Sequence, residues 1–219
     1  EIKGEGNLFQ RVYFAVSEGA AAKTLLKVGP ILDPDHMLTV RGIKLYADGA
    51  LGSRGAALLE NYHDYDTKGL LIFKQEEIMP VLEEALQKGI QIQTHAIGDR
   101  ANKITLDWYE EVFNSVSKKD RQIVDPRWRI EHSQIITKED QTRFKNLEVI
   151  ASMQPSHAIG DLYFAPDRLG MERIRDGYAW RNLIDLGVVI AGGSDAPVEI
   201  GDPLIEFYAA VERKDLDGF

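Results

Sequence analysis

Residues 91–103, QIQTHAIGDRANK, hold a strand-like segment, a turn and the start of a helical segment. From Gln91 to Thr94 polar and apolar side chains alternate, as in a β-strand, and His95 stands where that strand should end. The Gly98–Asp99 pair then predicts a turn into a segment with helical spacing. A single histidine at a strand end is more often a packing residue than a ligand. His95 becomes informative because similar strand ends recur along the chain.

The alternation of strand and helix runs through the sequence. We predict strands near residues 11–16, 41–47, 90–95, 128–132, 149–153 and 188–193. We predict helices at about residues 17–27, 75–88, 99–117, 137–146 and 171–186. Strict alternation of this kind predicts an α/β fold with a parallel sheet. No linker or low-complexity tract divides the chain.

Two parallel-sheet architectures fit this alternation. A doubly wound sheet normally carries a Gly-rich first turn, and neither G-x-G-x-x-G nor a P-loop occurs here. A (β/α)8 TIM barrel needs about 250 residues for eight units, whereas this chain has 219 residues and six predicted units. An open arc of strands would leave edges that favour aggregation. We therefore expect residues 1–219 to form an incomplete TIM-barrel-like domain, with the missing strands supplied by the rest of the protein or by an oligomeric partner.

Composition argues against several function classes. The chain is 44% hydrophobic and 28% charged, which suits one compact soluble domain. A net charge of -9 with scattered basic residues argues against a nucleic-acid partner. No apolar run approaches the roughly 20 residues that cross a bilayer, and the first residues do not resemble a signal peptide. We therefore expect no membrane partner and a cytoplasmic location. The absence of cysteine excludes thiolate metal sites and cysteine nucleophiles.

Side chains able to bind metal recur at the C-terminal ends of the predicted strands, where barrel enzymes build their active sites. Lys44, His95, His132 and Asp195 lie at four such positions, and His157 lies slightly beyond a fifth. Two imidazoles and a carboxylate suit a divalent metal such as zinc. An ammonium group repels cations, so lysine would need conversion to a carbamate by CO2. Recurrence at one rim favours a metal site over separate packing residues.

The chain contains, in this order, the motifs IKLYADGALGSRGAALLENYHD, QTHAIGDRANK, RIEHSQ, SMQPSHAIGDLYFAPDRLG, YAWRNLIDLGVVIAGGSDAPVE and DPLIEFYAAVER. This series resembles the amidohydrolase superfamily, in its YtcJ-like, amidohydrolase-3 branch, and the resemblance covers about residues 11–213. It implies that barrel strands three to eight are present. It also implies that Lys44 is a carboxylated, metal-bridging lysine and that His95 and His132 bind one metal. Asp195 would be a ligand that also transfers protons.

One part of the superfamily pattern is absent. The first strand of that family supplies a His-x-His pair, and no two of the five histidines here lie two residues apart. The histidines are His36, His63, His95, His132 and His157. This absence agrees with the deficit of two β/α units. We therefore expect the isolated chain to lack half of the ligands of its first metal and to be inactive or nearly so.

The resemblance implies hydrolysis of a C–N amide-type bond, other than a peptide bond, in a small molecule such as an N-substituted amide, a formamide or a cyclic amide. One or two divalent ions, expected to be zinc, would activate a hydroxide and polarise the carbonyl. Asp195 would accept the proton and pass it to the leaving nitrogen. Metal ligands alone do not separate this reaction from phosphotriester hydrolysis, because the attacking hydroxide is common to both.

Four polar residues are candidates for substrate contact. Asp48 and Arg54 lie in the segment DGALGSRGA, whose glycines allow the backbone to approach a substrate, and the alternative is an internal ion pair that braces the loop. His157 and Asp161 face the same predicted rim, where substrate contact and loop support are equal alternatives. A different class of function also stays open, namely a non-catalytic binding or regulatory module on a barrel remnant.

Overall fold

The computed structural model describes residues 5–6 and 8–219. The strands are β1 Val12–Ser17, β2 Ile31–Leu32, β3 Leu38–Tyr46, β4 Gln91–Ala96, β5 Arg129–His132, β6 Ile150–Met153 and β7 Ile190–Gly192. The helices are α1 Ala20–Val28, α2 Gln75–Gln87, α3 Asp99–Ser115, α4 Lys138–Asn146, α5 Pro155–Gly160, α6 Ala165–Arg173, α7 Trp180–Asp185 and α8 Pro203–Glu212. Short 3-10 turns cover Lys118–Asp120, Asp161–Tyr163 and Ile174–Asp176.

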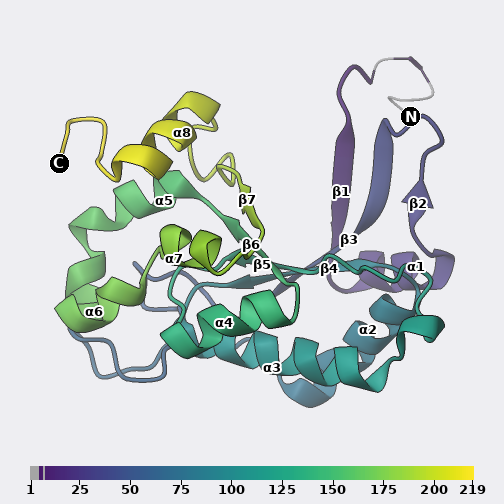
Figure 1. The fold of residues 1–219 in the computed structure, drawn as a ribbon, viewed down its shortest axis with the longest axis horizontal. Coiled ribbons are helices and arrows are strands. Elements are labelled where there is room, and N and C mark those ends of the chain that lie inside the picture. The colour runs from purple at the N-terminus through teal and green to yellow at the C-terminus, as the bar shows by residue number, and fades with distance from the viewer. Residues whose placement is uncertain (1–4, 7) are drawn as a thin grey trace.

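One sheet joins all the described strands in the order β1-β3-β4-β5-β6-β7, with β2 paired to β3 off this path. Every pairing along the path is parallel, whereas β2 runs antiparallel to β3. Helices α2, α3 and α4 lie side by side along the sheet (Figure 1). The fold is therefore α/β, an open half-barrel of six parallel strands that matches an incomplete TIM-barrel-like domain. The predicted fold class is confirmed.

The core lies between the sheet and its helices. Helix α2 buries Ile78, Leu82, Ala85 and Leu86, which recur at helical spacing and so share one face. Strand β4 is buried along almost its whole length because it lies in the middle of a parallel sheet that is covered by helices. Helix α3 adds buried aromatic residues that pack on the next strand segment, with the Tyr109 and Trp128 ring centroids 4.8 Å apart.

The predicted single helix over residues 171–186 is wrong. The segment consists of the end of α6, a 3-10 turn and the separate helix α7. Tyr178 has a φ of 52°, and its N–H donates to the carbonyl of Gln134 at 2.6 Å. This long-range hydrogen bond takes the chain out of the helical path. Proline in the first turn marks the start of α5, α6 and α8, and the periodicity predicts none of these three starts.

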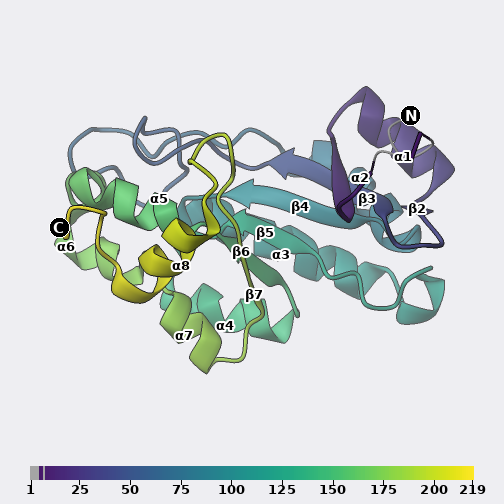
Figure 2. The same ribbon diagram turned by 90° about the horizontal axis from the view of Figure 1, so that it is seen from above.

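The register of the sheet brings the candidate residues to one edge. Tyr46 pairs with His95, and Ala96 pairs with His132, so the ends of β3, β4 and β5 are level. These three strands point the same way in Figure 2. Side chains at their C-terminal ends therefore gather at one rim, as in barrel enzymes.

Candidate active site

Three histidines form a continuous group at this rim. The ring centroids of His95, at the end of β4, and His132, at the end of β5, lie 4.4 Å apart in an edge-on arrangement. The ring of His157, from the first turn of α5, stacks on His132 at 5.6 Å. The structure thus brings together imidazoles that lie far apart in the sequence.

Each of these imidazoles has a buried nitrogen without a hydrogen-bond partner: Nε2 of His95, Nδ1 of His132 and Nε2 of His157. Burial, followed by the charge of Lys44, lowers the pKa of His95 to about 4, although a hydrogen bond to the Gly49 backbone acts in the opposite direction. Burial, followed by the neighbouring His95 and Lys44, lowers the pKa of His132 to about 2. Both rings are therefore neutral near pH 7, which is the form that binds metals.

Lys44 projects from β3 beside this group, with its Nζ 4.9 Å from the centre of the Tyr46 ring. Burial lowers the pKa of Lys44, whereas the charges of Glu131 and Asp195 raise it. Asp195 follows β7 and is exposed. Its φ of 58° and that of His132, 74°, lie in the left-handed region, which side chains rarely adopt. Such strained positions cluster at functional sites.

The donor chemistry fits a divalent metal. Neutral imidazoles with free nitrogens and a carboxylate on the same rim are the ligand types that zinc takes, and an unpaired buried nitrogen is costly unless something occupies it. Within residues 5–6 and 8–219, no three His, Cys, Asp or Glu side chains converge closely enough to hold an ion. The histidines are therefore gathered here, but the described side chains do not close a complete ligand set.

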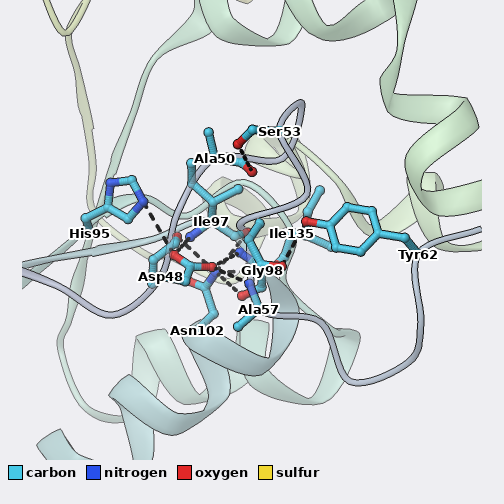
Figure 3. Close-up of polar contacts among 12 residues, drawn as sticks. Asp48, Ala50, Ser53, Ala57, Tyr62, His95, Ile97, Gly98, Asn102 and Ile135 are labelled. Atoms are coloured by element: carbon cyan, nitrogen blue, oxygen red, sulfur yellow. Dashed lines mark hydrogen bonds and ion pairs between the residues drawn. The ribbon is translucent and has the colours of Figure 1, made fainter. Parts of the chain in front are cut away.

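Asp48 lies just beyond β3 and is only 1% exposed. Its Oδ2 accepts hydrogen bonds from the backbone N–H groups of Ala57 and Gly98, both at 2.8 Å. Its Oδ1 accepts one from Ile97 at 3.0 Å and lies 3.4 Å from His95 Nε2 (Figure 3). Burial raises the pKa of Asp48 to about 7, while the three N–H donors act in the opposite direction. The carboxylate of Asp48 therefore points into the protein interior and not toward solvent.

Arg54 forms an ion pair within the protein. Its Nε and Nη2 donate to Asp64 at 3.0 and 2.8 Å, and Arg168 donates to the same carboxylate. The glycines of this loop approach protein backbone: Gly49 N–H donates to Gly55 O at 3.1 Å. A Cβ on Gly98 would lie 2.0 Å from the Ala57 carbonyl oxygen.

Asp161 is hydrogen-bonded within the protein, whereas His157 makes no hydrogen bond through Nε2 but lies near a carboxylate. Asp161 accepts hydrogen bonds from Gln134 Nε2, at 3.0 Å, and from the Tyr178 hydroxyl. Burial raises the pKa of Asp161, while these two donors lower it. Nε2 of His157 lies 3.7 Å from Glu199 Oε1. The sequence interpretation missed Gln134 and Glu199, although both lie within the motifs RIEHSQ and GGSDAPVE that carry candidate ligands.

The profile of the amidohydrolase family matches residues 1–218. This chain belongs to that family. YtcJ of Bacillus subtilis (strain 168), whose name places it among amidohydrolases, is 36% identical over 173 residues, 78% of this chain and 31% of YtcJ. Protein LONG AFTER FAR-RED 3 of Arabidopsis thaliana is 35% identical over 190 residues, 86% of this chain and 31% of that protein. The resemblance predicted from the motifs is thus confirmed.

Two solved structures share the fold of this amidohydrolase chain. An uncharacterized metal-dependent hydrolase from Pyrococcus horikoshii OT3 is 32% identical with a TM-score of 0.84, over 97% of this chain and 41% of that protein. Another uncharacterized metal-dependent hydrolase, from Pyrococcus furiosus, is 31% identical with a TM-score of 0.82, over 96% of this chain and 42% of that protein. Both of these solved proteins are described as metal-dependent hydrolases.

The chain spans about a third of the length of the curated relatives that it matches, 31% in both cases. It spans 41% and 42% of the two solved hydrolases. Across the part of the chain that the structure describes, no helix combines the length and the apolar character needed to cross a bilayer.

Proposed function

We propose that this chain is part of a metal-dependent amidohydrolase that cleaves a C–N amide-type bond, other than a peptide bond, in a small molecule. The observation that carries the proposal is the group of three histidines at the rim of the half-barrel, each with a buried nitrogen that makes no hydrogen bond. The family supports the reaction class. We further propose that residues 1–219 form part of a barrel domain whose remaining strands come from the rest of the protein or from a partner.

Four residues would hold the metal: Lys44 as its carbamate, His95, His132 and Asp195. Zinc, as one or two ions, suits the imidazole and carboxylate donors. When bound, such an ion supplies a water of lowered pKa and polarises the substrate carbonyl.

The side chains of this chain would orient the substrate and move the proton. Asp195 is exposed on the rim loop, so its carboxylate can reach the attacking water, accept its proton and pass it to the leaving nitrogen. His157 stands beside His132 with Nε2 unpartnered, and we assign it to substrate contact. Asp48, Arg54 and Asp161 have partners inside the protein, so we assign them to support of the surrounding loops.

A second candidate is a non-catalytic binding or regulatory module. The observation that would favour it is the absence of a His-x-His pair from the remaining barrel strands as well as from the five histidines of this chain. If the chain belongs to such a module, the protein with its remaining barrel strands should bind no stoichiometric metal and catalyse no turnover, whereas the hydrolase should do both. Metal content therefore separates the two functions before any substrate is known.

Asp195→Asn tests the proposed chemistry in a protein that includes the remaining barrel strands. Turnover of N-substituted amides, formamides or cyclic amides should fall about 10²- to 10⁴-fold because the proton carrier is lost, while elemental analysis still finds bound zinc. Asp185→Asn is the control, since Asp185 is exposed on α7 and pairs with Arg181. Unchanged turnover in Asp195→Asn would remove this residue from the mechanism. Absence of metal and turnover in the wild type would favour the non-catalytic module.

A further inference from the structure

The acceptor sites of the Asp48 carboxylate are almost all used. An ionised carboxylate has two oxygens with about four acceptor positions. Oδ2 receives two backbone N–H groups, from Ala57 and Gly98, whereas Oδ1 receives only that of Ile97. One acceptor position on Oδ1 is therefore left, and this is the oxygen 3.4 Å from His95 Nε2 (Figure 3).

His95 offers the matching donor. Its Nε2 is buried and makes no hydrogen bond of ordinary geometry, so a small rotation of the ring toward Asp48 would satisfy both groups. The neighbouring charged side chain, Lys44, has only donor hydrogens and cannot receive this N–H. The Gly49 backbone, whose hydrogen bond raises the pKa of His95, is the competing acceptor for a His95 N–H. If Nε2 carries the proton, Nδ1 keeps the lone pair, because a neutral imidazole has one donor and one acceptor nitrogen.

Asp48 also ties two segments to this imidazole. Its N–H donors come from the loop after β3, at Ala57, and from the turn between β4 and α3, at Ile97 and Gly98. Asn102 strengthens the same junction, since its Nδ2 lies within hydrogen-bond distance of the carbonyls of Gly98 and Ile135. The carboxylate therefore has one orientation, and a group held in this way can fix a partner ring.

We propose that Asp48 is a positioning residue for His95: its carboxylate receives the Nε2 proton, sets the ring orientation and leaves the Nδ1 lone pair for a ligand. The inference rests on the proposed function, in which His95 binds the metal. Partners of this kind orient metal-binding histidines and raise their basicity, and their loss weakens metal binding about 10- to 100-fold.

Asp48→Asn tests this assignment because the amide is not symmetric. The Oδ2 position faces two N–H donors and should keep the amide oxygen, which places the NH2 group at the Oδ1 position beside His95. Nε2 of His95 would then have to accept a hydrogen bond from this NH2 group, and the imidazole proton would move to Nδ1. Asp99→Asn is the matched control, since Asp99 Oδ1 receives the Leu59 and Arg100 N–H groups at 2.9 and 2.8 Å and no imidazole contact of Asp99 is found among the described residues.

The first measurement is 15N–1H NMR of the His95 imidazole in the metal-free protein that includes the remaining barrel strands, at a pH above about 7, where Asp48 is ionised. We expect the Nε2–H tautomer in the wild type and Asp99→Asn, and a shift to Nδ1–H in Asp48→Asn. An Nδ1–H tautomer in the wild type, or no change in Asp48→Asn, overturns the proposal. If Asp48→Asn does not fold, the tautomer of His95 in the wild type alone decides: Nε2–H supports the proposal and Nδ1–H overturns it.

The second measurement is Zn2+ affinity by competition titration, in a protein that includes the remaining barrel strands. Asp48→Asn should weaken Zn2+ binding about 10- to 100-fold, and Asp99→Asn should leave it within about threefold. Equal affinities in wild type and Asp48→Asn overturn the positioning role. Failure of every variant to bind Zn2+ counts against the proposed function, while the NMR result still decides between the two His95 tautomers.

Discussion

Gly98 lies where two loops of the candidate site meet, and its missing side chain lets them touch. The Ala57 carbonyl receives the N–H groups of Arg100 and Ala101 at 3.1 and 3.3 Å, directly above Gly98. A Cβ there would lie 2.0 Å from that carbonyl oxygen. Its φ of -73° is ordinary, so the requirement for glycine comes from packing and not from backbone conformation.

Gly98→Ala should lower the free energy of unfolding by about 1–3 kcal/mol, because backbone would have to move to admit the methyl group. Urea denaturation followed by circular dichroism measures this change. Gly160→Ala is the control: no atom lies within 4 Å of the added Cβ, and alanine there should be neutral or stabilise by about 0.4–1 kcal/mol. Equal midpoints for Gly98→Ala and wild type would contradict the packing described.

The loop after β3 is joined to helix α6 by one carboxylate. Asp64 accepts hydrogen bonds from Arg54 in its own loop and from Arg168 in α6, and Arg168 Nε also donates to Gly52 O at 3.1 Å. The hydrogen bonds from Arg54, followed by the charge of Arg168, hold the pKa of Asp64 below its usual range, although partial desolvation opposes them. Asp64 therefore links the loop to α6 by an ion pair, and Arg173 of α6 adds hydrogen bonds to the carbonyls of Glu60 and Asn61.

A lowered pKa in the folded state means that Asp64 stabilises the protein above the ordinary aspartate pKa of about 3.9. That contribution is lost as the pH falls through the folded value. Asp64→Asn should therefore be less stable than wild type at pH 7, and the difference should shrink below about pH 4. Urea denaturation from pH 7 to pH 3 tests this. Glu172→Gln is the control, because Glu172 is 89% exposed on the same helix; a difference for Asp64→Asn that does not vary with pH would disprove the linkage.

The open half-barrel has two side edges, β1 and β7. Edge strands present unpaired backbone groups that can pair with another chain. Phe14 on β1 is 51% exposed, which adds an apolar contact to that edge. A barrel that closes on itself has no such edges.

The 219-residue chain prepared alone should therefore self-associate with rising concentration, as measured by sedimentation velocity. Phe14→Lys should reduce the association, because a lysine on an edge strand opposes pairing. Phe9→Lys is the control, since Phe9 is 84% exposed but lies outside the strands. If both substitutions had the same effect, association would reflect general hydrophobicity and not the β1 edge.

The parallel strands and the rim positions of His95 and His132 could be predicted from the sequence, because both depend on periodicity within a few neighbouring residues. The family could be predicted from its motifs. The interruption of the predicted helix at Tyr178 could not be predicted, because it depends on a hydrogen bond from the Tyr178 N–H to the carbonyl of Gln134, on a distant segment. Only folding brings such partners together.

The orientation of Asp48 depends on folding in the same way. In sequence it is an acid in a glycine-rich loop, open to solvent or substrate. In the structure its carboxylate meets the N–H groups of Ile97 and Gly98, which lie 49 and 50 positions later in the chain. Residue type determined that this group could accept hydrogen bonds, but the pairing of β3 with β4 decided which donors it meets, since contacts across a parallel sheet join segments that are distant in sequence.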